Sequence, residues 1–284
     1  MINDFQRMQF LSEVLPNIKK FINRIIVIKY GGSVIQNYDL RNQVIQDILL
    51  LSSLGIKLVL VHGGGPIINH WLKKSNIEPK FYNGIRVTDK QTMDIVEMVL
   101  VGKVNKDLVS LMNKNGNCAV GLSGKDANLI IASPMFSNQE NFVGKVNKVN
   151  NQFLRLLLDN NYIPVIASVA SGHNGVAYNV NADTVAGNIA ISLHAEKLIL
   201  LTDTPGIMYD INDPATLLKH ITVSEAENLK QKKIVFGGMI PKLDCSINAV
   251  QSTVKSAHII DGRIQHALLL EILTSQGIGS MLTI

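Results

Sequence analysis

The fold of this chain is decided by the stretch Ile25–Ser33, which reads Ile-Ile-Val-Ile-Lys-Tyr-Gly-Gly-Ser. A run of β-branched and aliphatic residues is typical of a buried strand, and the glycine pair predicts a turn at its end. The stretch Leu58–Pro66, Leu-Val-Leu-Val-His-Gly-Gly-Gly-Pro, has the same organisation. Its three glycines let the backbone come close to a ligand, and Pro66 suits the first turn of a helix.

Strand and helix patterns alternate outward from these two stretches. We expect strands near residues 25–30, 57–61, 118–122, 127–133, 163–167 and 198–202, and helices near 39–54, 66–76, 89–115, 150–160, 183–194, 223–231, 238–253 and 265–275. Such alternation indicates parallel strands joined by crossover helices, in a sheet covered on both faces. The predicted fold class is therefore α/β, with a ligand crevice at the carboxyl ends of the strands, where the glycine turns lie. The polar segment 133–151 is interpreted as a loop or hairpin.

The N-terminal segment shows the spacing of an amphipathic helix. Its apolar residues recur at steps of three and four, namely Phe5, Met8, Leu11, Leu15, Ile18 and Ile22. Pro16 removes one helical hydrogen bond, so we expect a kink or two short helices there. The apolar stripe must pack against its own domain or against another subunit, and both possibilities stay open.

Composition excludes two classes of protein. The chain has 284 residues, of which 46% are hydrophobic and 17% charged, and no apolar run approaches the ~18 to 20 residues that span a bilayer. The net charge is +5, but the lysines are dispersed and no basic run is interleaved with aromatic residues. We therefore expect neither a membrane span nor a nucleic-acid partner.

Cysteine usage and the N-terminus bear on the compartment. Cys118 and Cys245 form no CxxC motif and are expected to be reduced thiols in a reducing compartment. The first residues resemble neither a signal peptide nor a transit peptide. Abundant Asn, Ile and Lys suggest AT-rich coding. We expect the chloroplast stroma if the protein is plastid-encoded, and otherwise a bacterial cytoplasm.

The glycine turns are typical of a phosphoryl-transfer site. Neither a P-loop motif nor a G-x-G-x-x-G motif after a strand occurs, so the lysines must come from elsewhere. Lys29 lies near the end of the first expected strand, and Lys242 follows the pair Gly237–Gly238. Asp183 can orient both lysines, although a surface lysine and a plain helix N-cap remain alternatives for Lys29 and Asp183.

Other residues suit the binding of anions and of a nucleotide. The N–H groups of Gly64 and Gly65 can bind an oxygen on which charge develops. Arg86 can clamp a carboxylate, unless it is a surface arginine, and the turn at Asp203–Ile207 suits a base or ribose. The seven histidines show no metal spacing, so no protein-bound transition metal is predicted. No nucleophile–base pair is evident, and an ionised carboxylate acceptor would need none.

The chain resembles the acetylglutamate kinases of the amino-acid-kinase family over essentially its whole length. The matching stretches are 27–32, 61–66, 83–88, 121–126, 179–183, 201–203 and 237–242. The resemblance implies a three-layer αβα sandwich around a mainly parallel open sheet. It also implies an N-terminal helix (1–24), a lobe that binds N-acetyl-L-glutamate (25–178) and a lobe that binds ATP (179–284). The implied reaction is phosphorylation of the side-chain carboxylate of N-acetyl-L-glutamate by ATP, the second step of arginine synthesis.

The resemblance also implies residue roles. Lys29 and Lys242 would stabilise the transition state, with Asp183 organising them. The substrate would be held by Gly64, Gly65, Arg86 and Asn179, and the nucleotide by Gly31, Gly32, Asp203, Gly206 and Gly238. Magnesium would be carried by the ATP phosphates rather than by a protein cage.

Regulation by arginine is implied as well. Arginine-sensitive members use a kinked N-terminal helix to build a homohexamer and bind arginine near the C-terminus, which here points to His258, Glu271 and Gly277. Asn17 replaces the family's usual tyrosine, which predicts weaker inhibition. Two further departures are Ala127, in place of a glycine, and Lys145, in place of an acidic residue. The signalling protein PII is a possible partner.

Two other functions remain to be distinguished. A related kinase acting on another acidic amino acid would keep the lysines and change the pocket around residues 82–88. A catalytically silent arginine sensor would keep residues 258–279 but lose Lys29, Asp183 or Lys242, and all three are present.

Overall fold

The computed structural model describes residues 3–31, 35, 37–82, 84–114, 116, 119–137 and 140–284, with the backbone alone at 6, 7, 10 and 11. Within these residues the main sheet has eight strands in the order β12-β14-β13-β11-β1-β2-β8-β5. Their bounds are β1 (Ile25–Tyr30), β2 (Lys57–His62), β5 (Ala119–Leu122), β8 (Ile163–Ala167), β11 (Lys197–Thr202), β12 (His220–Thr222), β13 (Ser256–Asp261) and β14 (Ser280–Thr283). Neighbours pair in parallel except β13 and β14. The predicted α/β class with a mainly parallel sheet is confirmed.

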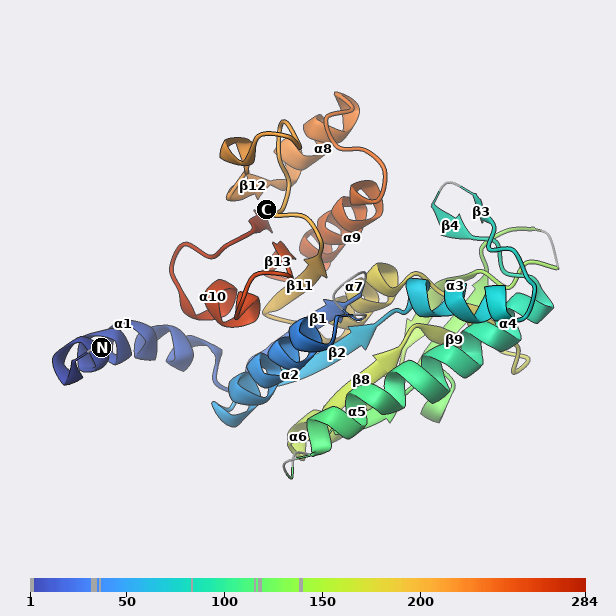
Figure 1. The fold of residues 1–284 in the computed structure, drawn as a ribbon, viewed down its shortest axis with the longest axis horizontal. Coiled ribbons are helices and arrows are strands. Elements are labelled where there is room, and N and C mark those ends of the chain that lie inside the picture. The colour runs from blue at the N-terminus through green and yellow to red at the C-terminus, as the bar shows by residue number, and fades with distance from the viewer. Residues whose placement is uncertain are drawn as a thin grey trace.

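Helices cover both faces of this sheet (Figure 1). One face packs against α2 (Tyr38–Ser53), α3 (Gly65–Lys74), α4 (Lys90–Glu97), α5 (Asn105–Asn113) and α10 (Ala267–Leu273). The other packs against α6 (Asn151–Asp159), α7 (Ala182–Leu193), α8 (Val223–Gln231) and α9 (Met239–Ser252). Alternate residues of β1 point to opposite sides, so Ile26 and Ile28 join one core and Val27 the other. The three layers follow from this alternation.

Smaller sheets lie beside the main one. A four-stranded sheet in the described chain has the order β10-β9-β6-β7, with β6 (Ile130–Pro134), β7 (Gly144–Val149), β9 (Val169–Ser171) and β10 (Ala177–Asn179). The hairpin interpretation of residues 133–151 is therefore confirmed, since β6 and β7 pair antiparallel. The strands β3 (Phe81–Tyr82) and β4 (Ile85–Arg86) form a short ribbon.

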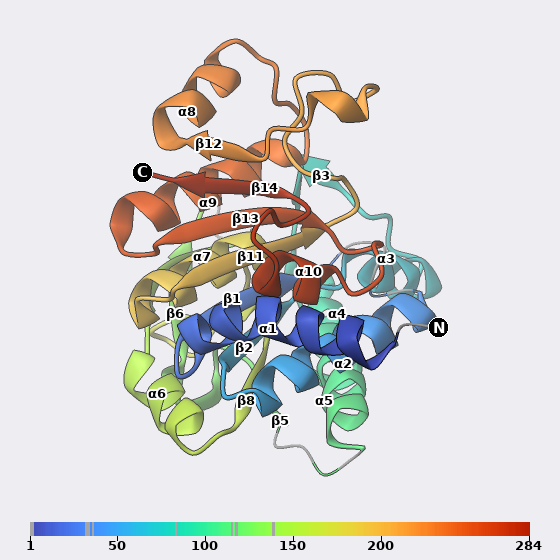
Figure 2. The same ribbon diagram turned by 90° about the vertical axis from the view of Figure 1, so that its left-hand side faces the viewer.

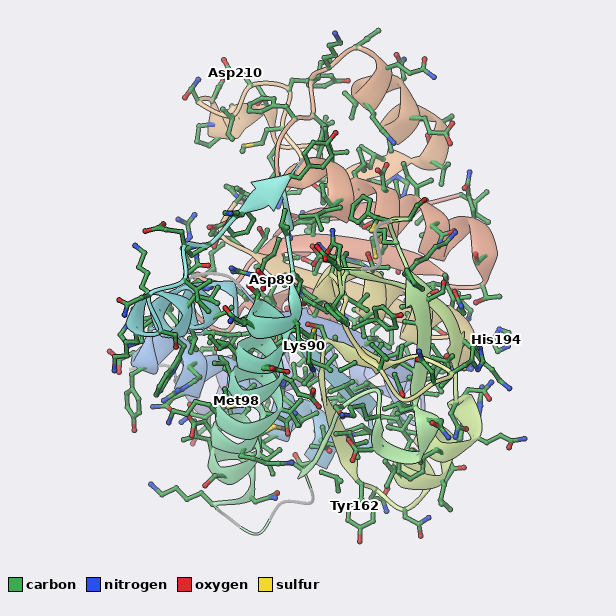
Figure 3. All side chains as sticks on the ribbon, turned by 90° about the vertical axis from the view of Figure 1, so that its right-hand side faces the viewer. Asp89, Lys90, Met98, Tyr162, His194 and Asp210 are labelled. Atoms are coloured by element: carbon green, nitrogen blue, oxygen red, sulfur yellow. The ribbon has the colours of Figure 1, made fainter. Side chains whose placement is uncertain are left out.

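The predicted helix at 89–115 has three parts. The α4 helix passes directly into a π-helical segment at Met98–Val104, and α5 continues from Asn105. In Figure 3, Asp89 marks the beginning of this helical column and Met98 the first residue of the π-helical segment. A π-helical turn is wider than an α-helical one and is frequent at functional sites.

The N-terminal helix α1 (Asp4–Phe21) runs unbroken through Pro16, so the expectation of two short helices is wrong. It lies beside α10 (Figure 2), and the amide of Asn17 donates a hydrogen bond to the Leu273 carbonyl at 2.9 Å. Phe5 and Met8 are 77% and 62% exposed. These two residues at the start of the apolar stripe are therefore not packed against the rest of the chain. Among the helices that the structure describes, none is long and apolar enough to cross a bilayer.

Candidate active site

The carboxylate of Asp183 lies between two lysines. Its Oδ1 is 3.0 Å from Lys29 Nζ, and its Oδ2 is 2.8 Å from Lys242 Nζ. Asp183 and Lys29 are buried, and Lys242 is mostly buried. One carboxylate therefore holds two cations at one point in a site of low water content, where charges act most strongly on a bound anion.

Three different elements deliver these side chains. Lys29 is near the carboxyl end of β1, and Lys242 is in the first turn of α9. Asp183 is in the first turn of α7, whose N-cap is Asn181; the Asn181 side chain accepts hydrogen bonds from the amides of Asp183 and Thr184. The alternative of Asp183 as a plain N-cap is therefore wrong, and its carboxylate is left to pair with the lysines.

The charges of this group follow from burial and pairing. Burial lowers the pKa of Lys29, and the adjacent Asp183 carboxylate opposes that effect. Burial acts to raise the pKa of Asp183, but the two lysines outweigh it and hold that pKa below its ordinary value. The aspartate is thus ionised at neutral pH, and its charge favours the ammonium form of Lys29.

Glycines allow the close packing around this centre. A Cβ on Gly31 would lie 2.9 Å from Lys29 Nζ, so a side chain there would displace the ammonium group. A Cβ on Gly64, which precedes α3, would lie 2.8 Å from Leu100 Cδ2 in the π-helical segment. A side chain at either position would therefore have to displace a neighbouring side chain, in addition to any effect on the amides.

These groups line one cleft of about 440 Å³. The cleft is bordered by the predicted residues Lys29, Gly31, Gly64, Gly65, Arg86, Asn179, Asp183 and Lys242. The structure therefore brings together every residue predicted for catalysis and for the acceptor substrate. Gly32, predicted for the nucleotide, lies outside the described residues.

Arg86 is held at one side of the cleft. Its Nη2 donates hydrogen bonds to Asn69 Oδ1 at 2.6 Å and to the Gly65 carbonyl at 3.3 Å, and its guanidinium lies 4.8 Å from the centre of the Phe81 ring. Among the described residues none bonds the buried Arg86 Nη1. Burial lowers the pKa of Arg86, but a guanidinium stays protonated at neutral pH. Arg86 is thus a preorganised cation with a free donor.

Asn179 is coupled to the same loop. Its Nδ2 donates to Thr88 Oγ1 at 3.0 Å, and the Thr88 hydroxyl donates to the Arg86 carbonyl at 3.0 Å. Thr88 is fully buried. This chain of hydrogen bonds fixes Asn179 and Arg86 relative to each other across the cleft.

A second cavity of about 420 Å³ lies next to the start of α9. Its lining is largely apolar and includes Ile207, Ile234, Phe236 and Met239 together with Gly206. Met239 borders this cavity and Lys242 the first, so one turn of α9 borders both. The arrangement fits a planar base here with phosphates reaching Lys242. The predicted nucleotide residues Asp203 and Gly238 do not line it.

A third cavity, of about 440 Å³, lies between α1 and α10. All three residues predicted for an effector, His258, Glu271 and Gly277, line it, as do Lys20 and Lys197. Gly277 has φ +59°, and a Cβ there would lie 2.7 Å from Glu271 Oε2. Glycine is therefore required for this close approach.

Buried charges organise the effector cavity. His258 Nδ1 lies 2.6 Å from Glu271 Oε1, and Lys197 Nζ lies 2.9 Å from His258 Nε2. Burial lowers the pKa of His258, so its ring is neutral at pH 7. Burial acts to raise the pKa of Glu271, but hydrogen bonds from His258 and from the amides of Ile278 and Gly279 hold it below its ordinary value. The cavity thus offers both an anion and cations.

Other predictions concern metals and cysteines. In the part of the chain that the structure describes, no group of three or more His, Cys, Asp or Glu side chains is arranged to hold a metal ion. Cys245 is a free thiol whose Sγ donates to the Asp183 carbonyl at 3.0 Å, and burial raises the pKa of that thiol to about 12. It is therefore an unreactive structural group. Cys118 lies outside the described residues.

Some site residues escaped the sequence analysis. Asn69 orients Arg86, Thr88 links Arg86 to Asn179, and Ser168 lines the cleft. Asn69 is four residues after Gly65, one turn into α3, and this spacing is the signal that points to it. The roles of Thr88 and Ser168 depend on contacts between distant segments, which no local pattern reveals.

Fold and cleft together define a phosphotransferase that holds phosphates without a P-loop, and comparison with known proteins gives the family. The model of the Amino acid kinase family matches residues 24–261, so the chain belongs to this family. Within it, the chain is a member of the acetylglutamate kinases. It is 64% identical over 285 residues to the acetylglutamate kinase of Gracilaria tenuistipitata var. liui, with 100% of both chains covered. It is 54% identical over 290 residues to that of a Nostoc species, covering 99% of this chain and 98% of the other.

Solved structures share the fold. The N-acetylglutamate synthase of Neisseria gonorrhoeae complexed with coenzyme A and N-acetyl-glutamate has a TM-score of 0.86 and 25% identity; the match covers 98% of this chain. This chain spans only 63% of the length of that synthase. The carbamate kinase of Giardia lamblia bound to AMP-PNP matches with a TM-score of 0.66 and 18% identity over 92% of this chain and 98% of the other, which supports the fold alone.

Proposed function

We propose that this protein transfers the γ-phosphoryl group of ATP to the side-chain carboxylate of N-acetyl-L-glutamate. An oxygen of the acceptor carboxylate forms the new bond to phosphorus as the bond between phosphorus and the β–γ bridging oxygen breaks. The products are ADP and N-acetyl-L-glutamyl 5-phosphate, a step of arginine biosynthesis. The observation that carries the proposal is the pairing of both lysines with the single carboxylate of Asp183.

The geometry of the cleft supplies what this reaction needs. The acceptor is already ionised, so no general base is required, and catalysis consists of positioning and charge stabilisation. Lys29 and Lys242 face the transferring group from different elements, and the Gly64 amide adds a neutral donor. These groups stabilise negative charge on the phosphoryl oxygens.

Substrate selection is assigned to the opposite side of the cleft. The free Arg86 Nη1 is suited to the α-carboxylate of the acceptor, and Asn179 is held beside it by Thr88. The second cavity holds the adenine on its apolar wall. ATP brings its magnesium ion on its phosphates, in keeping with the scarcity of acidic groups among the described cleft residues.

Regulation by arginine is part of the proposal. The third cavity offers the Glu271 carboxylate and the ammonium groups of Lys20 and Lys197, which match the guanidinium and the carboxylate of arginine. A related fold, the Neisseria synthase, has been solved complexed with L-arginine, with 24% identity and a TM-score of 0.81. Asn17 lines this cavity and bonds the Leu273 carbonyl at the end of α10, so a ligand bound there can act on the position of α1.

Assembly and location complete the proposal. The exposed apolar residues Phe5 and Met8 of α1 fit a contact with α1 of another subunit, as in a homohexamer made of dimers. PII is a partner to be tested in that assembly. Since relatives come from red algae such as Gracilaria and from cyanobacteria such as Nostoc, we assign the protein to the chloroplast stroma, with a bacterial cytoplasm as the alternative.

A steady-state assay of ADP release tests the assignment of the acceptor. With MgATP fixed, N-acetyl-L-glutamate is compared with L-glutamate, L-aspartate and N-acetyl-L-aspartate. We expect N-acetyl-L-glutamate to give the highest kcat/KM. A faster reaction with an unacetylated acid would instead assign the chain to a related amino-acid kinase.

A further inference from the structure

We propose that His62 and Asn105 form a buried relay that orients the Gly64 amide toward the transferring phosphoryl group. The inference rests on the proposed phosphoryl transfer in the cleft. Gly64 lines that cleft, whereas neither His62 nor Asn105 does. Both are therefore positioning residues, which act on the reaction through a peptide group.

Both side chains are completely buried. His62 is the last residue of β2, Asn105 is the first of α5, and each is 0% exposed. A polar group in such surroundings is costly unless hydrogen bonds satisfy it. Apolar side chains would fill the same space without the cost of removing polar groups from water. Packing alone therefore does not explain why these two residues are polar.

The hydrogen bonds fix the tautomer of His62. Asn105 Nδ2 lies 2.8 Å from the Val165 carbonyl oxygen, which can only accept, so this nitrogen is the donor end of the amide. The same Nδ2 lies 3.1 Å from His62 Nε2, which therefore accepts. The ring proton is thus on Nδ1, which donates to the Gly63 carbonyl oxygen at 3.1 Å.

The proton stays on Nδ1 over the physiological range of pH. Burial lowers the pKa of His62 to about 4, and the charge of Lys106 on α5 acts in the same direction. The imidazole is therefore neutral, and the direction of both hydrogen bonds is constant. Asn105 orients the ring, and the ring orients the Gly63 carbonyl.

Peptide planarity transmits this orientation to Gly64. The Gly63 carbonyl and the Gly64 N–H belong to one planar trans peptide unit, in which they point in opposite directions. With the carbonyl bonded to the buried imidazole, the N–H must point away from it. Among the residues that the structure describes, none accepts a hydrogen bond from this N–H. It is an available donor on the cleft lining.

Glycine explains why a restraint is needed. Three successive glycines permit many orientations of their peptide units, because no side chain limits rotation. A donor contributes most to catalysis when it is oriented before the reaction. The histidine thus restores at one peptide the rigidity that the glycine turn lacks.

The π-helical segment places the second member of the relay. It ends at Val104, directly before Asn105. Leu100 and Val104 of this segment lie 2.8 and 3.4 Å from the position that a Cβ on Gly64 would occupy. One irregular segment thus packs against Gly64 and directs Asn105 to His62, which agrees with the frequent occurrence of π-helical turns at functional sites.

Three variants of His62 separate this role from packing. In His62→Asn, the side-chain amide nitrogen takes the position of the histidine Nδ1 and can donate to the Gly63 carbonyl. In His62→Gln, the longer side chain places its amide only at the position of the histidine Nε2. His62→Leu keeps the volume and removes both. We expect kcat to fall roughly 10- to 100-fold in His62→Leu and His62→Gln, and clearly less in His62→Asn, with little change of either KM.

A transition-state mimic provides a readout that a structural role would not change. Binding of MgADP with aluminium fluoride and N-acetyl-L-glutamate should weaken in His62→Leu by about the factor lost from kcat, while binding of MgADP alone stays constant. Asn113→Ala is the matched control. Asn113 is also on α5 and bonds the Ala119 backbone, so its loss should lower Tm and leave kcat unchanged.

The outcomes are distinguishable. If wild-type protein releases no ADP in response to N-acetyl-L-glutamate, the proposed function fails, and this inference fails with it. If the wild type is active and His62→Leu keeps the wild-type kcat, the relay alone is refuted. It is also refuted if kcat of the three variants follows Tm instead of the presence of a donor near Gly63.

Discussion

Lys29 Nζ lies 3.0 Å from Asp183 Oδ1, although β1 and α7 supply the two side chains from separate parts of the chain. The other oxygen of the same carboxylate pairs with Lys242. A buried lysine without an anion would tend to lose its proton. Asp183 therefore does two things: its charge favours the ammonium form of Lys29, and its two oxygens fix the positions of both lysine side chains.

Replacement of Asp183 by asparagine tests this double role. We expect Asp183→Asn to lower kcat about 100-fold, a loss of ~3 kcal/mol in transition-state stabilisation. Because burial already lowers the pKa of Lys29, loss of the neighbouring charge should lower it further. On the alkaline side of the pH–rate profile, the variant should therefore lose its residual activity at a lower pH than the wild type. An unshifted alkaline limb would contradict the role of Asp183.

Arg86 and Lys242 should separate substrate binding from catalysis. Arg86→Ala removes a charged hydrogen bond to the acceptor. We therefore expect it to raise the KM for N-acetyl-L-glutamate about 10- to 100-fold. Lys242→Ala should instead lower kcat and leave that KM within about threefold, because its interaction strengthens in the transition state. Steady-state kinetics with both substrates decide the matter, and the reverse pattern would exchange the two roles.

Glu271 should control inhibition by arginine. Its carboxylate lines the third cavity, so the variant Glu271→Gln should require at least about tenfold more arginine for half-inhibition. The measured quantity is the ratio of inhibited to uninhibited rate in each protein, which cancels any change in basal rate. Near-ultraviolet circular dichroism establishes that the variant is folded. Equal sensitivity in wild type and variant would remove Glu271 from the effector site.

Stability should depend on pH through His62. Its pKa is about 6.5 in an unfolded chain and about 4 when buried, so between these values the unfolded state binds more protons. Stability is therefore lost as pH falls, by roughly 2 kcal/mol between pH 6.5 and pH 5. Urea unfolding at several pH values gives the free energy of unfolding of wild type and of His62→Leu. The difference between the two proteins isolates His62, because the buried His258 contributes equally in both. Parallel pH dependences would show that His62 is not buried as a neutral ring.

Ala127 carries backbone strain that glycine would relieve. It has φ +50° and ψ +31°, a left-handed conformation that costs alanine about 1 kcal/mol. Ala127 is exposed, so Ala127→Gly should stabilise the fold by about that amount and raise Tm by roughly 2 °C. Ala215, which is exposed in an ordinary 3₁₀ turn, is the control, since Ala215→Gly should destabilise. A lower Tm for Ala127→Gly would contradict the account of this turn.

Much of the fold follows from local patterns. The central strands β1 and β2 are continuous apolar runs that end in glycine turns, and their bounds agree closely with the expected ones. The strands β3, β4, β10, β13 and β14 were not predicted, although β13 is a buried six-residue strand of the main sheet. The short strands β9 and β12 were not predicted either. Each has three residues, and pairing partners rather than local sequence determine them.

The site was only partly accessible to sequence reasoning. Lys29 is two residues before the pair Gly31–Gly32, and Lys242 is four residues after Gly238, so the sequence itself draws attention to both lysines. The proposed relay of His62 and Asn105 gave no such signal in the sequence. It depends on the π-helical segment Met98–Val104, where the helix takes up one extra residue per hydrogen-bonded turn. A long amphipathic pattern conceals such a change, and only the contact between α5 and β2 reveals its consequence.

Trapping of the phosphorylated product tests the central claim most directly. An acyl phosphate reacts with hydroxylamine to give a hydroxamate, whereas simple ATP hydrolysis gives none. With MgATP and N-acetyl-L-glutamate, wild-type protein should form one hydroxamate per ADP released, and Asp183→Asn should form it about 100-fold more slowly. Release of ADP without hydroxamate, or an equal rate in the two proteins, would contradict phosphoryl transfer to a carboxylate at this centre.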